Sequence, residues 1–374
     1  MIVLYSSENL NTRRNLAYKN YFLQNKDTLI LNIPIEVSYE KSVKNFKILH
    51  IFLISYLKIK ANIKLLSKLN KLDKVDKIVV LFPGIIDLIF VKIFSRKYRN
   101  LIIYDYFISF YQTLVVDRKL VENFLIKYCL YKFEKFIISL PKLLIVETKQ
   151  IKNYIINLYK KELNISYILT PTDEKVYDYK NIMPSKNKDI DFLYWGTYIN
   201  LHGLDVLLEA AYINQDKFHV YLLGDGQEFE NINNLAKKLN LKNLTFDKTL
   251  FSNENKFEHF YKILSRSKFA IGTLSDSQKN NIVIPSKVIE AAALKIPTLT
   301  YYSSCIESYD MKLNAFYVKE PTLENLANLM KHLINNQSPD EIKDVVNNAF
   351  DWYKKRGSNN SFNQELKILL EKKI

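Results

Sequence analysis

The chain has 374 residues, enough for two domains of ordinary size, and its composition of 48% hydrophobic and 25% charged residues is that of a folded globular protein. No apolar run is long enough to span a bilayer, and the two cysteines, Cys129 and Cys305, are too isolated for a disulfide framework or a zinc site. A reducing cytoplasm is therefore the expected compartment.

The net charge of +15 is concentrated in the first half of the chain. Residues 1–180 hold 30 Lys and Arg against 16 Asp and Glu, a net charge of +14, whereas the remainder holds 24 against 23. This asymmetry predicts an anionic partner for the first half, such as lipid headgroups, a lipid-linked diphosphate or nucleic acid. Because no nucleic-acid-binding motif is present, nucleic acid is not the expected partner.

The first half alternates short apolar runs with helical segments, which is typical of an α/β sheet. The predicted strands are 1–5, 28–33, 78–82, 101–104, 143–147 and 165–169. The loop after the first strand lacks the paired glycines of a dinucleotide fingerprint, so a nicotinamide or flavin enzyme is not expected.

Residues 42–72 combine a helical apolar period with regularly spaced lysines. One interpretation is a surface helix with a solvated basic face, and the other is an interfacial helix that lies on an anionic membrane.

Asp105 directly follows the predicted strand 101–104. Ligands of open α/β sheets bind outside the carboxyl ends of strands, so Asp105 is a candidate catalytic residue that orients an acceptor hydroxyl. The structural alternative is that Asp105 caps the next segment and that Asp117 pairs with a neighbouring cation.

We predict four parts along the chain. An N-terminal acceptor-binding domain covers 1–172, a linker with one proline, mixed charges and no periodicity covers 173–188, and a second domain covers 189–355. Residues 356–374 are expected to form a C-terminal helix that can pack back on the first domain.

The second half repeats the α/β pattern, and its first two strands end in glycine. The predicted strands are 192–196, 218–223, 244–247, 269–273, 298–301 and 316–318. Gly196, Gly224 and Gly226 stand at carboxyl ends of strands, where glycine lets the backbone approach a ligand closely.

The stretch 284–300 predicts a short helix that leads into a strand, with Pro285 at the first helical position and Ser286 and Lys287 in the first turn. Lys287 and Glu290 are three residues apart and share one face near the positive end of the helix. This grouping suits a nucleotide sugar, with the ammonium and amides on the diphosphate and the carboxylate on the ribose. The alternative is a capped amphipathic helix with an ordinary ion pair.

Asp189 and Asp191 have the spacing of a metal-binding pair, but they precede their strand instead of ending it. A solvated strand start is the preferred interpretation, so neither a metal nor another cofactor is expected.

Three motifs in the second half together resemble a known family. They are Trp195-Gly196 followed by His202-Gly203, then Leu223-Gly224-Asp225-Gly226, then Pro285-Ser286-Lys287-Val288-Ile289-Glu290-Ala291. They cover roughly residues 190–302 and resemble the donor-binding domain of glycosyltransferase family 4. The resemblance implies an α/β fold of GT-B architecture, in which two Rossmann-like, doubly wound domains face a cleft.

Carried over residue by residue, the resemblance makes Glu290 the carboxylate that holds the donor ribose. Gly196, Gly203, Gly224 and Gly226 match backbone turns around the nucleotide. The donor site is also expected to include Thr197, His202, Pro285, Ser286 and Lys287, and Lys287 and Glu290 are expected among the catalytic groups as well. The stretch 105–119 is similar to one in bacterial members that assemble surface polysaccharides, which puts Asp105, Ser109 and Arg118 on the acceptor side.

The sequence departs from the family at three positions. Family members often carry Arg after the first glycine and Lys before the second, where this chain has Thr197 and His202, and the earlier of two paired Glu residues falls at Ile282. We expect Lys287 and the helix amides to supply the missing positive charge, and His202 to donate one hydrogen bond to a phosphate oxygen.

The resemblance implies a hexosyltransferase-type enzyme that moves a sugar from a nucleotide-diphosphate donor to a glycan or lipid-linked acceptor in surface polysaccharide or glycoconjugate assembly. A retaining, metal-independent reaction is expected, in the cytoplasm or at the inner face of an anionic membrane. The alternatives are a sugar-nucleotide epimerase of the same fold and a nucleotide-sugar-binding scaffold without catalysis.

Overall fold

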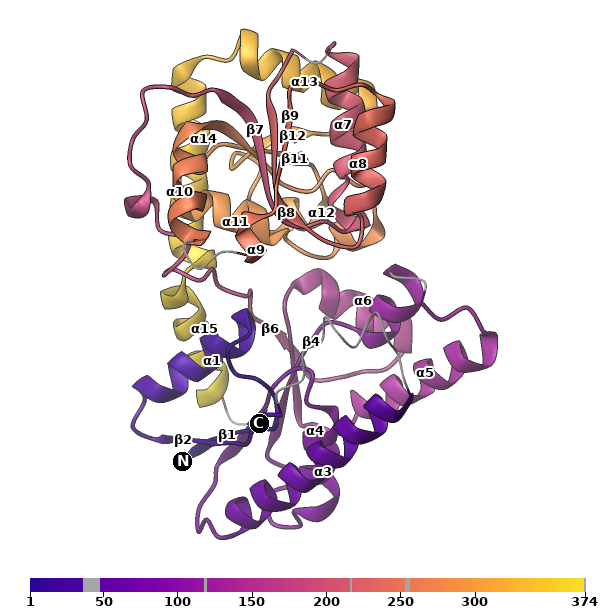
Figure 1. Ribbon diagram of the computed structural model, residues 1–374. Helices are drawn as coiled ribbons and strands as arrows, with labels where there is room; N and C mark the ends of the chain where they lie inside the picture. The colour runs from indigo at the N-terminus through magenta and orange to yellow at the C-terminus, as the bar shows by residue number, and fades with distance from the viewer. Residues whose placement is uncertain (36–47, 118–119, 216, 253–255, 373–374) are drawn as a thin grey trace. The chain divides into compact units, whose positions relative to one another are not determined.

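The computed structural model describes the chain except for residues 36–47, 118–119, 216, 253–255 and 373–374. It divides into two compact units, which we call unit 1 (Met1–Pro171 with Phe362–Ile374) and unit 2 (Thr172–Ser361). Each unit is built on its own six-stranded sheet of parallel strands flanked by helices (Figure 1).

The sheet of unit 1 has the strand order β2-β1-β3-β4-β5-β6. Its strands are β1 (Ile2–Ser6), β2 (Thr28–Asn32), β3 (Lys77–Val80), β4 (Ile102–Phe107), β5 (Leu143–Val146) and β6 (Ile165–Tyr167). The helices are α1 (Arg13–Gln24), α3 (Ile48–Asn70), α4 (Ile85–Phe94), α5 (Phe124–Ile137), α6 (Lys149–Tyr159) and α15 (Asn359–Glu371), with a π-helical turn η1 (Gln112–Asp117).

The core on one face of this sheet joins the two ends of the chain. Phe362, Leu366 and Leu370 of α15 pack with residues of β1 and α1, and the rings of Tyr18 and Phe362 meet edge to face at 5.2 Å. Burial of these apolar side chains is what fixes the C-terminal helix on unit 1.

Unit 2 has the strand order β12-β11-β10-β7-β8-β9, all parallel. Its strands are β7 (Ile190–Thr197), β8 (Val220–Asp225), β9 (Leu244–Asp247), β10 (Ser267–Ile271), β11 (Thr298–Tyr301) and β12 (Phe316–Val318). The longer helices are α7 (Leu204–Ile213), α8 (Phe229–Lys238), α10 (Lys256–Arg266), α11 (Ser286–Ala293), α13 (Leu323–Asn335) and α14 (Pro339–Trp352). Short helices are η2 (Tyr179–Asn181), η3 (Asn200–His202), α9 (Thr249–Ser252), η4 (Gln278–Asn281), α12 (Ser304–Ser308) and η5 (Tyr353–Gly357).

Helices cover both faces of the unit 2 sheet (Figure 1). Residues of α7, α8 and α13 pack on one face and residues of α10 and α11 on the other. From β7 the chain first adds β8 and β9 on one side of the sheet and then β10, β11 and β12 on the other, so unit 2 is doubly wound. Ligands of such sheets bind at the carboxyl ends of the strands where the direction reverses, here between β7 and β10. The predicted α/β fold of two Rossmann-like domains is confirmed.

Residues 173–188, predicted as a linker, pack on unit 2. Tyr177 and Ile182 lie against its core, and the Tyr261 hydroxyl donates to the Val176 carbonyl at 2.9 Å. The mixed charges and the lack of periodicity of this segment obscure the two apolar side chains that anchor it.

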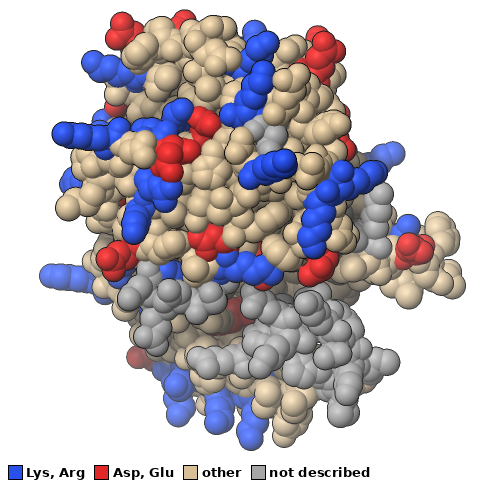
Figure 2. Space-filling model, turned by 45° about the horizontal axis from the view of Figure 1, so that its top comes forward, with Lys and Arg blue, Asp and Glu red and all other residues tan. Residues whose placement is uncertain are grey.

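Basic and acidic side chains are interspersed over the upper part of the view in Figure 2. This distribution agrees with the near-neutral balance of the second half of the sequence.

Candidate functional site

The predicted donor residues of unit 2 come together at the carboxyl edge of the sheet. Gly196 and Thr197 end β7, Gly224 lies at the end of β8 with Gly226 one residue beyond it, and Ser286 begins α11, which follows β10. Thr197 and Ser286 are exposed to solvent, whereas Gly224 is buried beneath them. The site therefore has an open rim and a floor made of backbone.

Lys287 is held across the strand reversal between α11 and β7. Its Nζ lies 4.7 Å from the centre of the Tyr194 ring and 3.5 Å from His202 Nε2, and the residue is only 6% exposed. A cation over an aromatic face is stabilised by the ring quadrupole. The first turn of α11 thus brings a fixed positive charge to the edge of the site, next to helix amides that favour anions.

Pro285 occupies the N-cap of α11, one position earlier than predicted, and Ser286 is the first helical residue. The Pro285 carbonyl accepts from the amide of Val288 at 3.0 Å. Proline at this position has an extended ψ of 130°, which turns the chain into the helix.

Gly196 makes room for the lysine. A Cβ atom on Gly196 would lie 3.2 Å from Lys287 Nζ, and its φ of +118° is one that side chains rarely adopt. The neighbouring strand is equally tight, since a Cβ on Gly224 would lie 1.9 Å from the Gly196 carbonyl oxygen. These two glycines are therefore required for the close approach of β7, β8 and Lys287.

Glu290 lies one helical turn below Lys287. Its Oε2 accepts a hydrogen bond of 2.9 Å from Trp195 Nε1, and the residue is 6% exposed. The indole in turn packs edge to face on Phe260 with the ring centres 5.6 Å apart. Glu290 is thus a nearly buried carboxylate that is held in place by the indole of Trp195.

His202 is engaged on both ring nitrogens. Nδ1 lies 2.8 Å from the Thr197 carbonyl oxygen and 2.6 Å from the Tyr194 hydroxyl, so we assign the proton to Nδ1, which leaves the Nε2 lone pair facing the ammonium of Lys287. Burial, and then the positive charge of Lys287, lower the pKa of His202 from 6.5 to about 3.

Both ring nitrogens thus have partners within the protein, and the expected hydrogen bond of His202 to a phosphate oxygen stays a prediction. The neutral ring accepts from Lys287 and donates to the backbone of β7, so it also holds the lysine in place. Gly203, the next residue, has a φ of +67° and starts α7.

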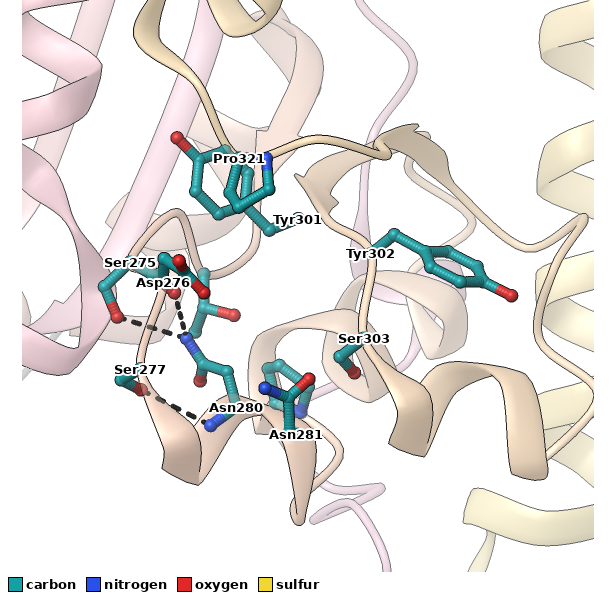
Figure 3. A pocket seen from close by; sticks show the side chains of 11 residues that line it. Ser275, Asp276, Ser277, Asn280, Asn281, Tyr301, Tyr302, Ser303 and Pro321 are labelled. Atoms are coloured by element: carbon teal, nitrogen blue, oxygen red, sulfur yellow. Dashed lines mark hydrogen bonds between the residues drawn. The ribbon is translucent and has the colours of Figure 1, made fainter.

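A small polar pocket, part of it open to solvent, adjoins Pro285 (Figure 3). One wall is the segment between β10 and α11, which carries Ser275, Asp276, Ser277 and Asn280, and another wall carries Tyr302 and Ser303. Asn280 Nδ2 donates to the Ser275 carbonyl at 2.7 Å and to Ser275 Oγ at 3.1 Å, while its buried Oδ1 has no hydrogen-bond partner among the described residues. Such a lining suits a hydroxyl-rich ligand.

Little in the sequence indicates this pocket. Its only signal is the polar run 275–281 after a predicted strand. Ile282, the position of the family's first carboxylate, is buried and cannot hydrogen-bond a ligand through its side chain.

Asp105 is fully buried inside unit 1 and pairs with Arg14 (side-chain N–O distances 2.7–3.0 Å). Tyr18 donates a third hydrogen bond to Oδ1 at 3.1 Å. Arg14 also donates to the Ile168 carbonyl and the Thr170 hydroxyl. This buried ion pair occupies the carboxylate of Asp105. The expected contact of Asp105 with an acceptor is therefore wrong.

Ser109 is also buried, and its side chain is hydrogen-bonded to Glu134. Its hydroxyl donates to Glu134 Oε2 at 3.1 Å and accepts from the amide of Gln112 at 3.0 Å. The expected acceptor-side role of Ser109 is therefore corrected to a structural one, and Arg118 lies outside the described residues.

A polar cluster at the carboxyl end of β1 was missed by sequence reasoning. Glu8 pairs with Lys58 of α3, and Asp87 of α4 accepts from the Ser7 amide at 2.6 Å and from Asn62 at 2.7 Å. Burial raises the pKa of Glu8, although the charge of Lys58 opposes this. Ser6-Ser7-Glu8 after a buried strand is the signal that could have revealed it.

Asp189 and Asp191 are each paired with a cation. Arg266 binds Asp189 through two nitrogens, and Lys268 Nζ lies 2.7 Å from Asp191. The described residues contain no cluster of three or more His, Cys, Asp or Glu that could hold a metal ion.

Known structures share this fold over nearly the whole chain. Sucrose-phosphate synthase of Thermosynechococcus elongatus aligns with a TM-score of 0.69 and 13% identity over 99% of this chain and 98% of its own. HepE of Anabaena in complex with UDP-glucose aligns with a TM-score of 0.68 and 12% identity over 99% of each chain. A glycosyltransferase of Rickettsia africae aligns with a TM-score of 0.64 and 15% identity over 100% of this chain and 99% of its own. A search of curated proteins finds no significant match.

These likenesses define the fold as GT-B. Residues 177–352, most of unit 2, match the family model described as Glycosyl transferases group 1. This part of the chain is therefore similar to that family, within a chain that has the GT-B fold throughout.

Replacing His202 by Asn tests the neutral, buried ring. The unfolded chain binds a proton at His202 below about pH 6.5 whereas the folded chain does not until about pH 3, so this residue costs about 1.4 kcal/mol of stability per pH unit as the pH falls between these values. In His202→Asn, the free energy of unfolding, measured with denaturant from pH 7 to 4, should fall less steeply than in the parent protein. His332→Asn, on the exposed side of α13, is the control, and an unchanged slope in His202→Asn would contradict the assignment.

The buried pair of Arg14 and Asp105 predicts a stability effect. Asp105→Ala leaves a buried guanidinium unpaired and should lower the free energy of unfolding by about 3–5 kcal/mol, measured by urea unfolding. The double variant Arg14→Met with Asp105→Leu removes both charges and should recover much of this loss. A fully stable Asp105→Ala protein with reduced turnover would restore the catalytic assignment.

Proposed function

We propose that the protein transfers a sugar from a nucleoside-diphosphate donor, bound at the carboxyl edge of the unit 2 sheet, to a glycan or lipid-linked acceptor. The observation that carries the proposal is the fixed ammonium of Lys287 at the first turn of α11, beside Gly196. A cation and helix amides at one point are suited to a diphosphate. HepE, with the same fold, was solved with UDP and UDP-glucose, which supports this class of donor.

Each group then has a distinct role. Lys287 and the amides of the first turn of α11 stabilise the negative charge that develops on the leaving diphosphate. Glu290, fixed by Trp195, accepts hydrogen bonds from the ribose hydroxyls, and the polar pocket beside Pro285 receives sugar hydroxyls.

The proposed reaction is a metal-independent displacement with retention. The bond between the anomeric carbon and the diphosphate oxygen breaks, the acceptor oxygen bonds to that carbon on the same face, and the acceptor proton passes to the departing diphosphate. The contribution of the protein is positioning and charge stabilisation.

We further propose that the acceptor belongs to surface polysaccharide or glycoconjugate assembly and is met at the cytoplasmic face of an anionic membrane. The net charge of +14 on residues 1–180 supports an anionic surface as partner. No helix among the described residues has both the length and the apolarity to cross a membrane.

Two other functions would use the same donor site. A nucleotide-sugar-binding scaffold is favoured by Ile282, which removes a carboxylate from the site. An epimerase of the same fold would also bind the donor and break the same bond.

Donor binding should depend on Lys287 and Glu290 in different ways. Loss of a charged hydrogen bond costs about 1.5–3 kcal/mol, so Lys287→Ala should weaken binding of a nucleoside diphosphate by about tenfold to a hundredfold, measured by calorimetry. Glu290→Gln should weaken the binding of ribonucleoside diphosphates and leave the binding of inorganic diphosphate nearly unchanged. Lys331→Ala, an exposed lysine of α13, is the matched control, and unchanged affinity in Lys287→Ala would refute the role of the ammonium.

Transfer itself is tested with a panel of nucleotide sugars and acceptors, followed by mass spectrometry of the products. We expect one donor that raises the thermal stability of the protein and is consumed only when an acceptor is present. Conversion of the donor sugar without any acceptor would establish the epimerase, and binding without conversion over the panel would establish the scaffold.

A further inference from the structure

Helix α5 of unit 1 presents apolar side chains to solvent over most of its length. Phe124 is 77% exposed and Leu125 69%, and Tyr128, Phe133 and Phe136 are exposed as well. With a helical period these five residues cover one broad face, and the charged residues within it are Lys132 and Lys135. A soluble helix normally turns such a face toward the core.

The other face of α5 is anchored by one buried carboxylate, Glu134. It accepts from the hydroxyls of Tyr106, Tyr159 and Ser109 and from the amides of Phe110 and Tyr111. Five donors on one side chain fix the rotation of the helix, so the apolar face cannot turn inward without breaking this cluster.

The charged residues of the apolar face are positive. Lys127 lies at its border, and Lys132 and Lys135 lie within it, with the Lys132 ammonium 5.3 Å from the Tyr128 ring centre. Glu134 is the only acidic residue of α5, and it points into the unit. Aromatic and apolar side chains with lysines on one helix face are typical of helices that lie in the interface of an anionic bilayer.

A second helix of unit 1 has the same character. Phe52, Tyr56, Ile59 and Ile63 of α3 are exposed and follow a four-three-four spacing, which forms a single stripe. Lys60, Lys64 and Lys68 flank this stripe and are exposed.

We propose that the apolar face of α5 inserts into the headgroup region of an anionic bilayer and docks unit 1 on the membrane. The proposal rests on the membrane part of the proposed function and names the element that makes the contact. A second copy of this chain is a poorer occupant, because a symmetric dimer through α5 would bring two basic surfaces together.

Cys129 provides a direct probe. It lies on the exposed side of α5, whereas Cys305 is buried, so an environment-sensitive fluorophore can be attached to Cys129 alone. Mixing the labelled full chain with vesicles of phosphatidylcholine and phosphatidylglycerol should shift the emission to the blue, and pure phosphatidylcholine should not. High salt should weaken the effect, since the lysines act through long-range attraction.

The double variant Phe124→Ser with Leu125→Ser removes the two most exposed apolar side chains of the face. Because transfer of each from water to the interface contributes roughly a factor of ten, vesicle binding in flotation should fall by at least about tenfold. Ile213→Ser with Leu313→Ser is the matched control, since both residues are comparably exposed apolar positions of unit 2, and it should bind vesicles like the parent chain.

Three results would overturn the proposal. They are flotation without a change in the probe, equal vesicle binding by the α5 variant and the parent, and a concentration-dependent dimer of the parent that the α5 variant abolishes. Nucleoside-diphosphate binding, measured on the same variants, reports separately on the donor site, so its loss would count against the proposed transferase and not against α5.

Discussion

The contact of Lys287 with Tyr194 and His202 is the interaction on which the site of unit 2 depends. It joins the first turn of α11 to the end of β7, across the strands where the order of the sheet reverses. Without it, α11 would still pack through its apolar residues, but its ammonium would lie in solvent. The surrounding backbone is shaped to this contact, since Gly196 leaves space for Nζ and the neutral His202 ring supplies a lone pair instead of a second positive charge.

Unit 1 uses its charges differently. Asp105 of β4 is neutralised by Arg14, and Glu134 of α5 accepts hydrogen bonds from five donors. Both carboxylates therefore stabilise the unit from inside. A buried ion pair of this kind gains its energy only if every hydrogen bond is satisfied, and the satisfied geometry is what removes these groups from ligand chemistry. In unit 2, the cation of Lys287 instead lies beside the exposed rim formed by Thr197 and Ser286.

Much of the fold could be predicted because its information is local. Apolar runs bounded by polar turns predict the twelve strands found among the described residues, and the spacing of Lys287 and Glu290 predicts their shared helix face. The partners of a charged side chain are not local. Asp105 and Arg14 are 91 positions apart, and no pattern in the sequence states that they meet, so a carboxylate at the end of a strand was assigned to a ligand when it belongs to the core. For His202 the difficulty was the same, since its protonation depends on burial beside a lysine 85 positions away.

The orientation of α5 shows a further limit of periodicity. Its sequence is apolar on nearly every side, so the helix is predictable but its buried face is not. The partners of Glu134, which come from β4, the loop after it and α6, fix the rotation together with Tyr131, whose hydroxyl donates to the Leu158 carbonyl at 3.1 Å. These inward contacts select the face that turns toward the unit and leave Phe124 and Leu125 outside. The exposed apolar face of α5 is therefore a consequence of the polar contacts on its opposite face.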